Sequence, residues 1–258
     1  MLSQERQSQI ISILEKEHVI KITDVVKKFH VSHETVRRDL ETLQEQGLVK
    51  RVYGGAILTE GTPSNPVSPR SGGHGYAERR AIGKLAAGLV HDGDTVLLAM
   101  GSTILEVAKN IRHIKDLTVL TNSISVLNEL VDSDVTLYLL GGHVSSAEHH
   151  MDGQLALQTL QFFNVDIGFV GAGGVTIETG VSDYSYEAAQ MIQTMLTRAK
   201  RTVLVAQSEK FGKNCFSVAC PLNAIHTIVS DNNLSNDYIK AIQEMGIEVI
   251  LASAENNG

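Results

Sequence analysis

Tryptophan is absent from this chain of 258 residues, and aromatic residues make up only 5% of it. Proteins that bind single-stranded nucleic acid usually stack bases on aromatic side chains, so this scarcity argues against such a protein. No apolar run approaches the roughly 20 residues needed to cross a bilayer. The first residues, Met1 to Arg6, are polar. We therefore expect neither a signal peptide nor a membrane span, and we predict a cytoplasmic protein.

Cysteine is also scarce, because Cys215 and Cys220 are the only two in the chain. They have no companion pair that would complete a zinc site. We interpret them as reduced thiols, as is usual in cytoplasmic proteins, and a disulfide between them is the alternative.

One stretch is rich in side chains that can bind metal ions, namely His143, Glu148, His149, His150 and Asp152. Two adjacent histidines cannot easily direct their rings at one ion, and no spacing typical of zinc ligands is present. We interpret the stretch as a polar loop that can line a ligand cleft. We expect no metal ion and no cofactor.

Three of the four prolines lie between Thr59 and Tyr76, together with the pair Gly72-Gly73. Neither residue type suits a helix or a central strand, which is typical of a linker. We predict an N-terminal domain over residues 1–57, a linker over 58–76 and a second domain over 77–258. The net charge is −7, yet residues 1–57 hold 9 Lys and Arg against 8 Asp and Glu. The acidic excess belongs to the second domain, so the first can present a basic face.

Three helices are predicted in the N-terminal domain, because apolar residues recur there at a spacing of three or four. The first follows Ser3, the second follows Thr23, and the third runs from Ser32 to about Gln46. The turn His30-Val31-Ser32 separates the last two. The residues predicted to face inward are Ile10, Ile13, Leu14, Val25, Val26, Phe29, Val36, Leu40 and Leu43.

A β-hairpin is predicted next, from Leu48 to Ile57, because apolar and polar residues alternate around a turn at Gly54-Gly55. Gly47 ends the third helix before it. Helix, turn, helix and hairpin in this order are typical of a winged helix-turn-helix domain, which binds double-stranded DNA.

Base recognition by such a domain depends on the first side chains of its third helix. Arg37 is the strongest candidate, because its planar guanidinium matches O6 and N7 of guanine. Ser32 can cap the helix and reach a phosphate. The alternative is that the charged residues only solvate a small helical domain. The predicted DNA-binding residues are Ser32, His33, Glu34, Thr35, Arg37, Arg38, Lys50, Arg51 and Tyr53, with Lys27 and Lys28 adding contacts to the DNA backbone.

The second domain alternates short apolar runs with helical segments, which predicts an α/β fold. Several predicted strands are apolar on both faces, as at Val96–Met100, and such strands belong to a parallel sheet covered by helices. Strands are predicted at residues 95–100, 118–121, 135–140, 166–170, 202–206, 227–229 and 248–251, and helices at 78–90, 104–111, 124–131, 186–198 and 236–245.

Ligands of open α/β sheets bind where strands end and helices begin. The first such turn, Met100-Gly101-Ser102-Thr103, combines a glycine, two hydroxyls and a helix N-terminus, which favours an anion such as phosphate. Thr103 and Glu106 also have the spacing of a capping box. Thr121-Asn122-Ser123 and Gly141-Gly142 form the next two turns. Ordinary turn chemistry is the alternative for each.

Two further features follow predicted strands. Lys210 can pair with a phosphate or a sugar oxygen, and a solvated surface cation is the alternative. Gly171-Ala172-Gly173-Gly174 can line the same cleft or can simply permit a tight turn.

The segments VSHETVRRDL (Val31–Leu40) and VKRVYGGA (Val49–Ala56) closely resemble the signature of the DeoR family of bacterial sugar-metabolism regulators. In the second domain, Thr121-Asn122-Ser123, Gly141-Gly142 and Lys210-Phe211-Gly212 occur in the order found in that family. The resemblance covers nearly the whole chain. It implies a winged helix-turn-helix joined to a sensor related in fold to ribose-5-phosphate isomerase. It also implies a phosphorylated sugar effector that relieves repression.

The resemblance further implies basic effector ligands ahead of the sensor, at Arg70 and Arg79. The full set of expected effector-binding residues is Arg70, Arg79, Gly101, Ser102, Thr103, Thr121, Asn122, Ser123, Gly141, Gly142 and Lys210.

Two positions depart from the family pattern, because Ala99 and Gln207 stand where the family usually has Asp. A carboxylate accepts hydrogen bonds from sugar hydroxyls, alanine cannot, and an amide carries no charge. The phosphate-binding half of the site is therefore retained and the hydroxyl-binding half altered. This pattern predicts a phosphorylated effector with an unusual arrangement of hydroxyls.

The resulting prediction is a DNA-binding regulator, a repressor of a carbohydrate-metabolism operon, with no catalytic residues. One alternative is a sugar-phosphate isomerase with a DNA-binding head, for which Asp183 and Glu187 would be the remaining acids. Another is a constitutive DNA binder whose sensor has lost its ligand. A small winged domain normally needs two copies to read a long operator, so we expect a homo-oligomer.

Overall fold

The computed structural model describes residues 6, 7, 9–11, 13, 14, 19–45, 49–52, 55–58, 75–146 and 148–253. These residues form two compact units, one up to residue 58 and one from Gly75 onward, which are described separately. No helix in the described part is long and apolar enough to cross a membrane.

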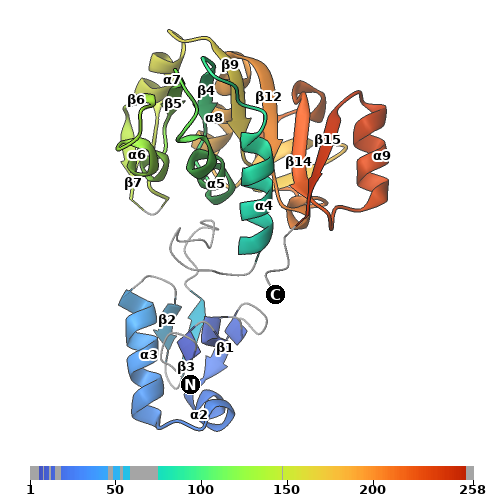
Figure 1. The fold of residues 1–258 in the computed structure, drawn as a ribbon. Coiled ribbons are helices and arrows are strands. Elements are labelled where there is room, and N and C mark those ends of the chain that lie inside the picture. Colours follow the sequence, from blue (N-terminus) through green and yellow to red (C-terminus); the bar gives the residue numbers. More distant parts are fainter. Residues whose placement is uncertain are drawn as a thin grey trace. The chain divides into compact units, whose positions relative to one another are not determined.

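The N-terminal unit is a helical domain with a small antiparallel sheet (Figure 1). Its described residues between 6 and 14 are helical. The strands β2 and β3 form the predicted hairpin, with Val49 opposite Leu58 and Val52 opposite Gly55. Gly55 therefore lies in a strand and not in the turn. The elements that follow the first helical residues are β1 (Val19–Lys21), α2 (Ile22–Phe29), α3 (His33–Glu45), β2 (Val49–Val52) and β3 (Gly55–Leu58).

Strand β1 was not expected from the sequence. It is only three residues long, and its partner β3 comes after α2 and α3 in the chain. Gly55 makes this pairing possible. A Cβ at position 55 would lie 1.9 Å from the carbonyl oxygen of Ile20. The short helix α2 begins at Ile22, directly after β1, and not after Thr23.

One apolar core holds the N-terminal unit together, and it uses the inward faces predicted for its helices. Ile10 and Leu14 from the first helix meet Val36 and Leu40 of α3, and all four are fully buried. The helix-turn-helix thus follows from the 3.6-residue period of its apolar residues.

The C-terminal unit is built on a seven-stranded sheet in the order β15-β14-β12-β9-β4-β5-β6. Every neighbouring pair in it is parallel, which confirms the predicted α/β fold. The seven predicted strands all form, with ends shifted by up to three residues. They are β4 (Thr95–Leu98), β5 (Thr118–Thr121), β6 (Thr136–Leu139), β9 (Val165–Val170), β12 (Ala199–Val205), β14 (Thr227–Asp231) and β15 (Glu248–Ala252).

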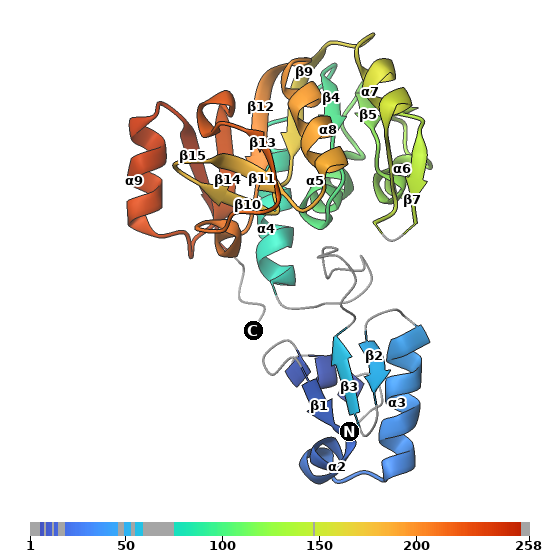
Figure 2. The same ribbon diagram turned by 180° about the vertical axis from the view of Figure 1, so that it is seen from behind.

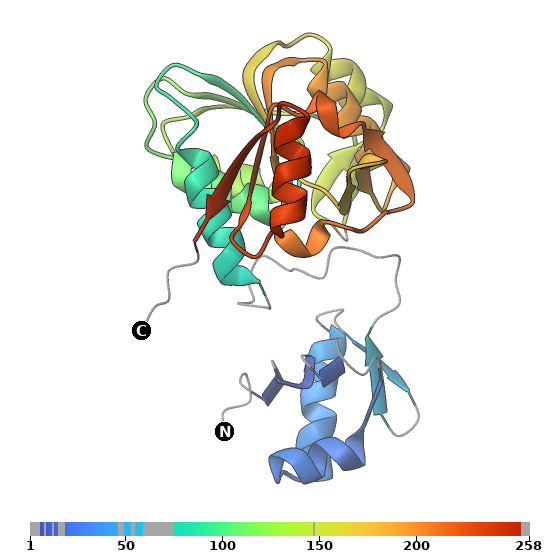
Figure 3. The same cartoon turned by 90° about the vertical axis from the view of Figure 1, so that its right-hand side faces the viewer.

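Helices cover both faces of this sheet. On one face, α4 (Tyr76–Ala87), α5 (Ser102–Ile111) and α6 (Ile124–Leu130) pack against outward-pointing residues such as Val96 and Phe169. On the other face lie α7 (Gln154–Leu160), α8 (Tyr186–Leu196) and α9 (Asn236–Glu244). Figure 3 shows α4 in teal and α9 in red on opposite sides of the red strands.

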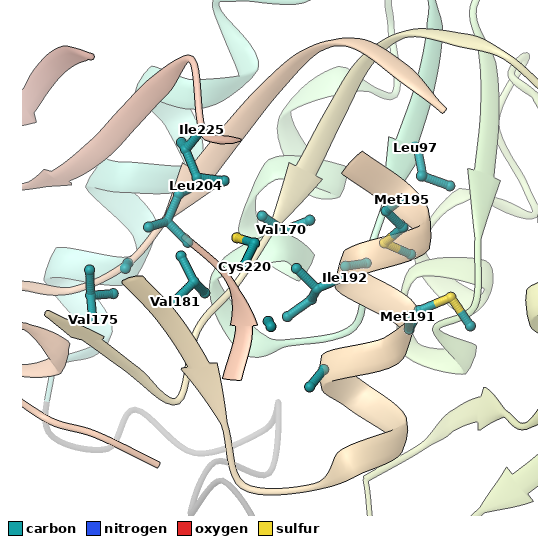
Figure 4. Close-up of a cluster of buried hydrophobic side chains, with 14 of the residues drawn as sticks. Leu97, Val170, Val175, Val181, Met191, Ile192, Met195, Leu204, Cys220 and Ile225 are labelled. Carbon is teal, nitrogen blue, oxygen red and sulfur yellow. The ribbon is translucent and has the colours of Figure 1, made fainter. Parts of the chain in front are cut away.

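Several short elements were not expected from the sequence. A second, antiparallel sheet contains β10 (Gly174–Thr176), β11 (Gly180–Asp183) and β13 (Ser217–Cys220), and it lies beside α8 (Figure 2). Its apolar residues, among them Val181 and Cys220, join the core formed by Leu204 and Ile192 (Figure 4). The others are the hairpin β7 (His143–Ser145) and β8 (His150–Asp152), α7, and the single turns η1 (Ser208–Lys210) and η2 (Leu222–Ala224).

Both cysteines are free thiols. Burial raises the pKa of Cys220 to about 11, so its thiol stays protonated at neutral pH.

Candidate functional sites

The third helix of the N-terminal unit begins as the sequence predicts. The Ser32 hydroxyl oxygen accepts a hydrogen bond from the backbone N–H of Thr35 at 3.1 Å, and it lies 2.8 Å from the Thr35 hydroxyl. The helix proper then starts at His33. A side-chain cap of this kind satisfies one of the free N–H groups at a helix start.

The exposed face of α3 carries the charged residues expected to read DNA. His33, Glu34, Arg37 and Arg38 are all exposed, while Thr35 is half-buried. Arg38 Nε lies 3.4 Å from Glu34 Oε1, so Arg38 forms an ion pair with the carboxylate one helical turn earlier. Arg37 makes no ion pair with any described residue.

The inner face of α3 carries a carboxylate that the sequence analysis overlooked. Asp39 is 3% exposed and accepts hydrogen bonds from Arg6 Nε at 2.5 Å and from Gln7 Nε2 at 3.1 Å. The signal was its place between the inward residues Val36 and Leu40, because a buried acid requires a cation. This ion pair fixes the first helix against the recognition helix.

The wing residues are placed only in part. Lys50 and Arg51 lie in β2, and their side chains are outside the described residues. Tyr53 and Arg70 are also outside them. The contributions of these four residues stay predictions.

In the C-terminal unit, the order of the strands reverses direction between β4 and β9. From β4 the chain adds β5 and β6 on one side, and it then returns to add β9, β12, β14 and β15 on the other. The carboxyl ends of the two strands at such a reversal flank the usual ligand crevice of an open α/β sheet. A Cβ at Gly171, after β9, would lie 3.8 Å from the carbonyl oxygen of Met100, after β4.

The Gly-Ser-Thr turn lies at this reversal. Gly101 has a φ of 130°, and α5 begins at Ser102. No side chain caps the helix, so the predicted capping box does not form. Glu106 is buried and pairs instead with Lys109 Nζ at 2.6 Å. The first N–H groups of α5 therefore have no side-chain cap, which suits an anion.

The turn after β5 is largely occupied by local bonds. Thr121 Oγ1 accepts from the N–H of Ser123, and Ser123 Oγ accepts from the N–H of Val126 as the cap of α6. Asn122 is buried and donates from Nδ2 to the carbonyl of Met151 at 2.9 Å. Its Oδ1 has no hydrogen-bond partner among the described residues.

Gly142 allows the start of β7 to lie close to the end of β8, since a Cβ there would lie 2.3 Å from the carbonyl oxygen of Asp152. Gly141 is exposed, with open space around it. Gly142 thus has a packing role, while Gly141 leaves room at the edge of the sheet.

The polar stretch forms an acid–histidine cluster around the buried His150. His150 is 2% exposed, with Nε2 3.3 Å from Asp152 and Nδ1 3.6 Å from Glu148. His143 lies 3.0 Å from Asp152. Across the described chain, no three His, Cys, Asp or Glu residues are placed to hold a metal ion.

Asp183, at the end of β11, lies within electrostatic range of both His150 and Lys210. Burial raises its pKa and also that of Glu148. Strand β11 belongs to the small sheet that was not predicted from the sequence. From the sequence, Asp183 was considered only as a possible catalytic acid of an isomerase. Buried acids such as these gain from a ligand that donates hydrogen bonds to them.

Arg79 and Lys210 approach the same edge from α4 and from η1. Arg79 is 3% exposed, and its Nη1 donates to Gln207 Oε1 at 3.3 Å. Burial lowers the pKa of its guanidinium, and Glu209 and Glu106 partly offset that effect. Lys210 Nζ lies 3.8 Å from Glu209. Both are cations with limited access to water, so an anion would stabilise them.

Two family models match successive parts of the chain. Residues 6–62 match the DeoR-like helix-turn-helix domain, and residues 74–232 match the DeoR C terminal sensor domain. A putative aga operon transcriptional repressor of Escherichia coli O157:H7 is 31% identical over 96% of this chain and 93% of its own length. The transcriptional repressor AccR of Agrobacterium fabrum is 33% identical over 89% of this chain and 90% of its own.

Among solved structures, ribose 5 phosphate isomerase A from Neisseria gonorrhoeae aligns with 53% of each chain, at 14% identity and a TM-score of 0.40. The two matched domains together span most of this sequence. The chain therefore belongs to the DeoR family and is a DNA-binding transcriptional regulator, with a helix-turn-helix domain followed by a sensor domain.

Proposed function

We propose that this regulator is a repressor of a carbohydrate-metabolism operon that releases its operator when a phosphorylated, sugar-type effector binds the sensor. The observation that carries the proposal is the uncapped N-terminus of α5 at the strand reversal, with Lys210 and Arg79 approaching the same edge of the sheet. The two relatives compared above bear the name of repressor.

In this proposal the phosphate lies at the start of α5. The N–H groups and the hydroxyls of Ser102 and Thr103 donate to it, and Lys210 and Arg79 supply positive charge. The hydroxyl end of the effector donates to Asn122 Oδ1, which is buried without a hydrogen-bond partner among the described residues. Asp183 lies near enough to Lys210 to act with it.

The domain boundaries of the proposal are a DNA-binding domain over residues 1–57, a linker over 58–76 and a sensor over 77–258. The protein acts in the cytoplasm, where its operator lies, and as a homo-oligomer, because one small winged domain reads only a short half-site. It binds its effector without converting it, since Ala99 and Gln207 stand where acids are expected. Release of DNA requires that the effector bind the DNA-incompetent conformation more tightly.

Fluorescence anisotropy on the region upstream of the protein's own gene tests the proposal. A panel of sugar phosphates is added, each with its unphosphorylated counterpart. Specific binding that one phosphorylated compound releases supports a repressor with a phosphate-binding sensor. Specific binding that no compound releases favours the constitutive binder, and absence of specific binding would send the protein to an isomerase assay.

A matched pair of variants examines the phosphate site. Lys210→Gln should need about tenfold more of the releasing compound or worse, because a charge-assisted hydrogen bond is lost. Lys213→Gln removes an exposed lysine three residues away and should behave as the parent protein. Equal effects of the two changes would argue against Lys210 as a ligand.

A further inference from the structure

Gln207 is a buried amide at the carboxyl end of β12 that bonds to the start of α4 in two ways. Its Oε1 accepts from Arg79 Nη1 at 3.3 Å, and its Nε2 donates to the carbonyl oxygen of Gly75 at 3.1 Å. The same Gly75 carbonyl accepts the first helical bond of α4, from the N–H of Arg79 at 3.0 Å. The side chain of Gln207 therefore contacts the first turn of α4 twice, at the backbone carbonyl of Gly75 and at the side chain of Arg79.

Only an amide can make both of these bonds. A carboxylate at position 207 would accept from Arg79, but it could not donate to a carbonyl and would repel it. Gly75 is matched to this contact, because its φ is +76° and an added Cβ would lie 2.2 Å from Gln207 Nε2. The replacement of the expected acid by glutamine thus has a structural partner 132 residues away.

Gln207 is also the residue from which the turn η1 begins. Its carbonyl oxygen accepts from the N–H of Lys210 at 2.9 Å. The N–H of Ser208 donates to the buried carboxylate of Asp231 at 2.7 Å, which fixes the turn to the end of β14. A ligand that moves Lys210 therefore also shifts Gln207, because one hydrogen-bonded turn joins the two residues.

The bond between Gln207 and Arg79 can be broken by an anion. A neutral amide oxygen carries no net charge, so it holds a guanidinium less strongly than a phosphate oxygen does. Glu209 on η1 and Glu106 on α5 lie within electrostatic range of Arg79, so the guanidinium is near both elements proposed to hold phosphate. An incoming phosphate would attract Arg79 away from the amide.

We propose that Gln207 is a releasable contact, called the latch below. It holds the first turn of α4 at the proposed effector-binding edge, and its hydrogen bond with Arg79 breaks when a phosphate binds. In the sequence, Gly75 directly follows the segment that leads from the DNA-binding domain. The inference rests on the proposed phosphate site and specifies how that site is regulated. An acid at position 207 would form a buried ion pair that the effector would have to break.

Hydrogen exchange on the full-length protein, with inorganic phosphate as the probe, tests the latch. In the parent protein, phosphate should protect the first amides of α5 and should speed exchange at residues 79–83 of α4 by about fivefold or more, since bonds that hold its first turn are lost. Gln207→Glu should keep the protection at α5 but lose the acceleration at α4, because a charged side chain retains Arg79. Gln207→Ala should exchange rapidly at α4 with or without phosphate.

Gln193→Glu is the matched control. Gln193 Nε2 donates to the carbonyl oxygen of Val218 at 3.3 Å, which is the same kind of bond away from α4. This variant should respond to phosphate as the parent does. Protection at α5 without any change at α4 in the parent would overturn the latch and leave the phosphate site standing. No protection at α5 would overturn both.

Discussion

Arg37 and Arg38 are neighbours in the sequence, yet they have different surroundings on α3. Arg38 is paired with Glu34 one helical turn earlier, whereas Arg37 has no ion-pair partner among the described residues. Such a free guanidinium can turn fully toward a base edge, while Arg38 first has to leave a carboxylate.

Arg37→Ala should therefore reduce sequence discrimination more than Arg38→Ala does. We expect Arg37→Ala to lose about 1–3 kcal/mol of preference for the upstream DNA over an unrelated duplex, as for other arginine–guanine contacts. Anisotropy titrations on both duplexes at one salt concentration measure it. If Arg37→Ala weakened binding to the two duplexes equally, Arg37 would be a phosphate contact instead.

The ion pair between Asp39 and Arg6 is the second feature that acts through single residues. Both side chains are almost fully buried, at 3% and 8% exposure. Removing one partner leaves the other charge buried and unpaired, so Asp39→Ala should cost about 3–5 kcal/mol of unfolding free energy.

Urea unfolding of the full-length protein, followed by signals from the N-terminal unit, measures this cost. The double variant Arg6→Met with Asp39→Leu is the control, because it removes both charges and keeps the volume apolar. It should recover most of the loss. An Asp39→Ala protein as stable as the parent would show that the pair contributes nothing.

Among whole elements, α4 and α5 pack closely at Gly83. A Cβ at this position would lie 2.4 Å from Glu106 Cβ and 2.6 Å from the Glu106 carbonyl carbon. The contact is to backbone as well as side chain, so the two helices would have to separate. Gly83 thus sets the distance between the helix that carries Arg79 and the helix that starts at Ser102.

Gly83→Ala should lower the unfolding free energy of the sensor by about 1–3 kcal/mol, the usual cost of overpacking a core. Thermal or urea unfolding measures it. Gly141→Ala is the control, because nothing lies within 4 Å of the added Cβ there. It should change stability by less than about 0.5 kcal/mol. Equal effects of the two substitutions would mean that the helices move apart without cost.

The elements predicted from the sequence are those whose residues repeat over several turns or over a whole buried strand. Most of the elements that escaped prediction are strands of only three or four residues, which carry little period of their own; α7, with seven residues, also escaped. Strand β1 forms through its pairing with β3, and β8 through its pairing with β7 and its bridge to Ser123. Their partners are supplied by the tertiary fold.

At the scale of the whole molecule, buried carboxyl groups make stability depend on pH. Burial raises the pKa of Asp183 from its ordinary value of 3.8 and that of Glu148 from 4.5. The folded protein then holds these protons more tightly than the unfolded chain does. Stability contributed by the protonated forms is complete below the ordinary values and is lost as the pH rises through the raised ones.

Asp183→Asn should therefore increase the unfolding free energy at pH 7, by about 1.4 kcal/mol for each unit by which the pKa is raised. The gain should vanish below about pH 4, where Asp183 is protonated in both states. Asparagine keeps the acceptor for the N–H of Tyr184, which donates to Asp183 at 2.7 Å. Urea unfolding across this pH range measures the difference, with Asp132→Asn at an exposed turn as the control. A gain that persists at pH 3.5 would assign the effect to packing.

By itself, the sequence determined the local structure of this protein. The inner face of α3, the cap at Ser32, the alternation of buried strands and helices, and the glycine turn before α5 are all properties of neighbouring residues. Each is set by helical or strand periodicity, or by the backbone freedom of one residue.

The tertiary structure alone decided which of these local pieces meet. It placed the ends of β4 and β9 side by side, paired Asp39 with Arg6 across 33 residues, and joined Gln207 to Gly75 across 132. Spacing along the chain does not encode such contacts, because they arise from the order in which strands join the sheet and helices pack on it. The proposed effector-binding edge is made almost entirely of contacts of this kind.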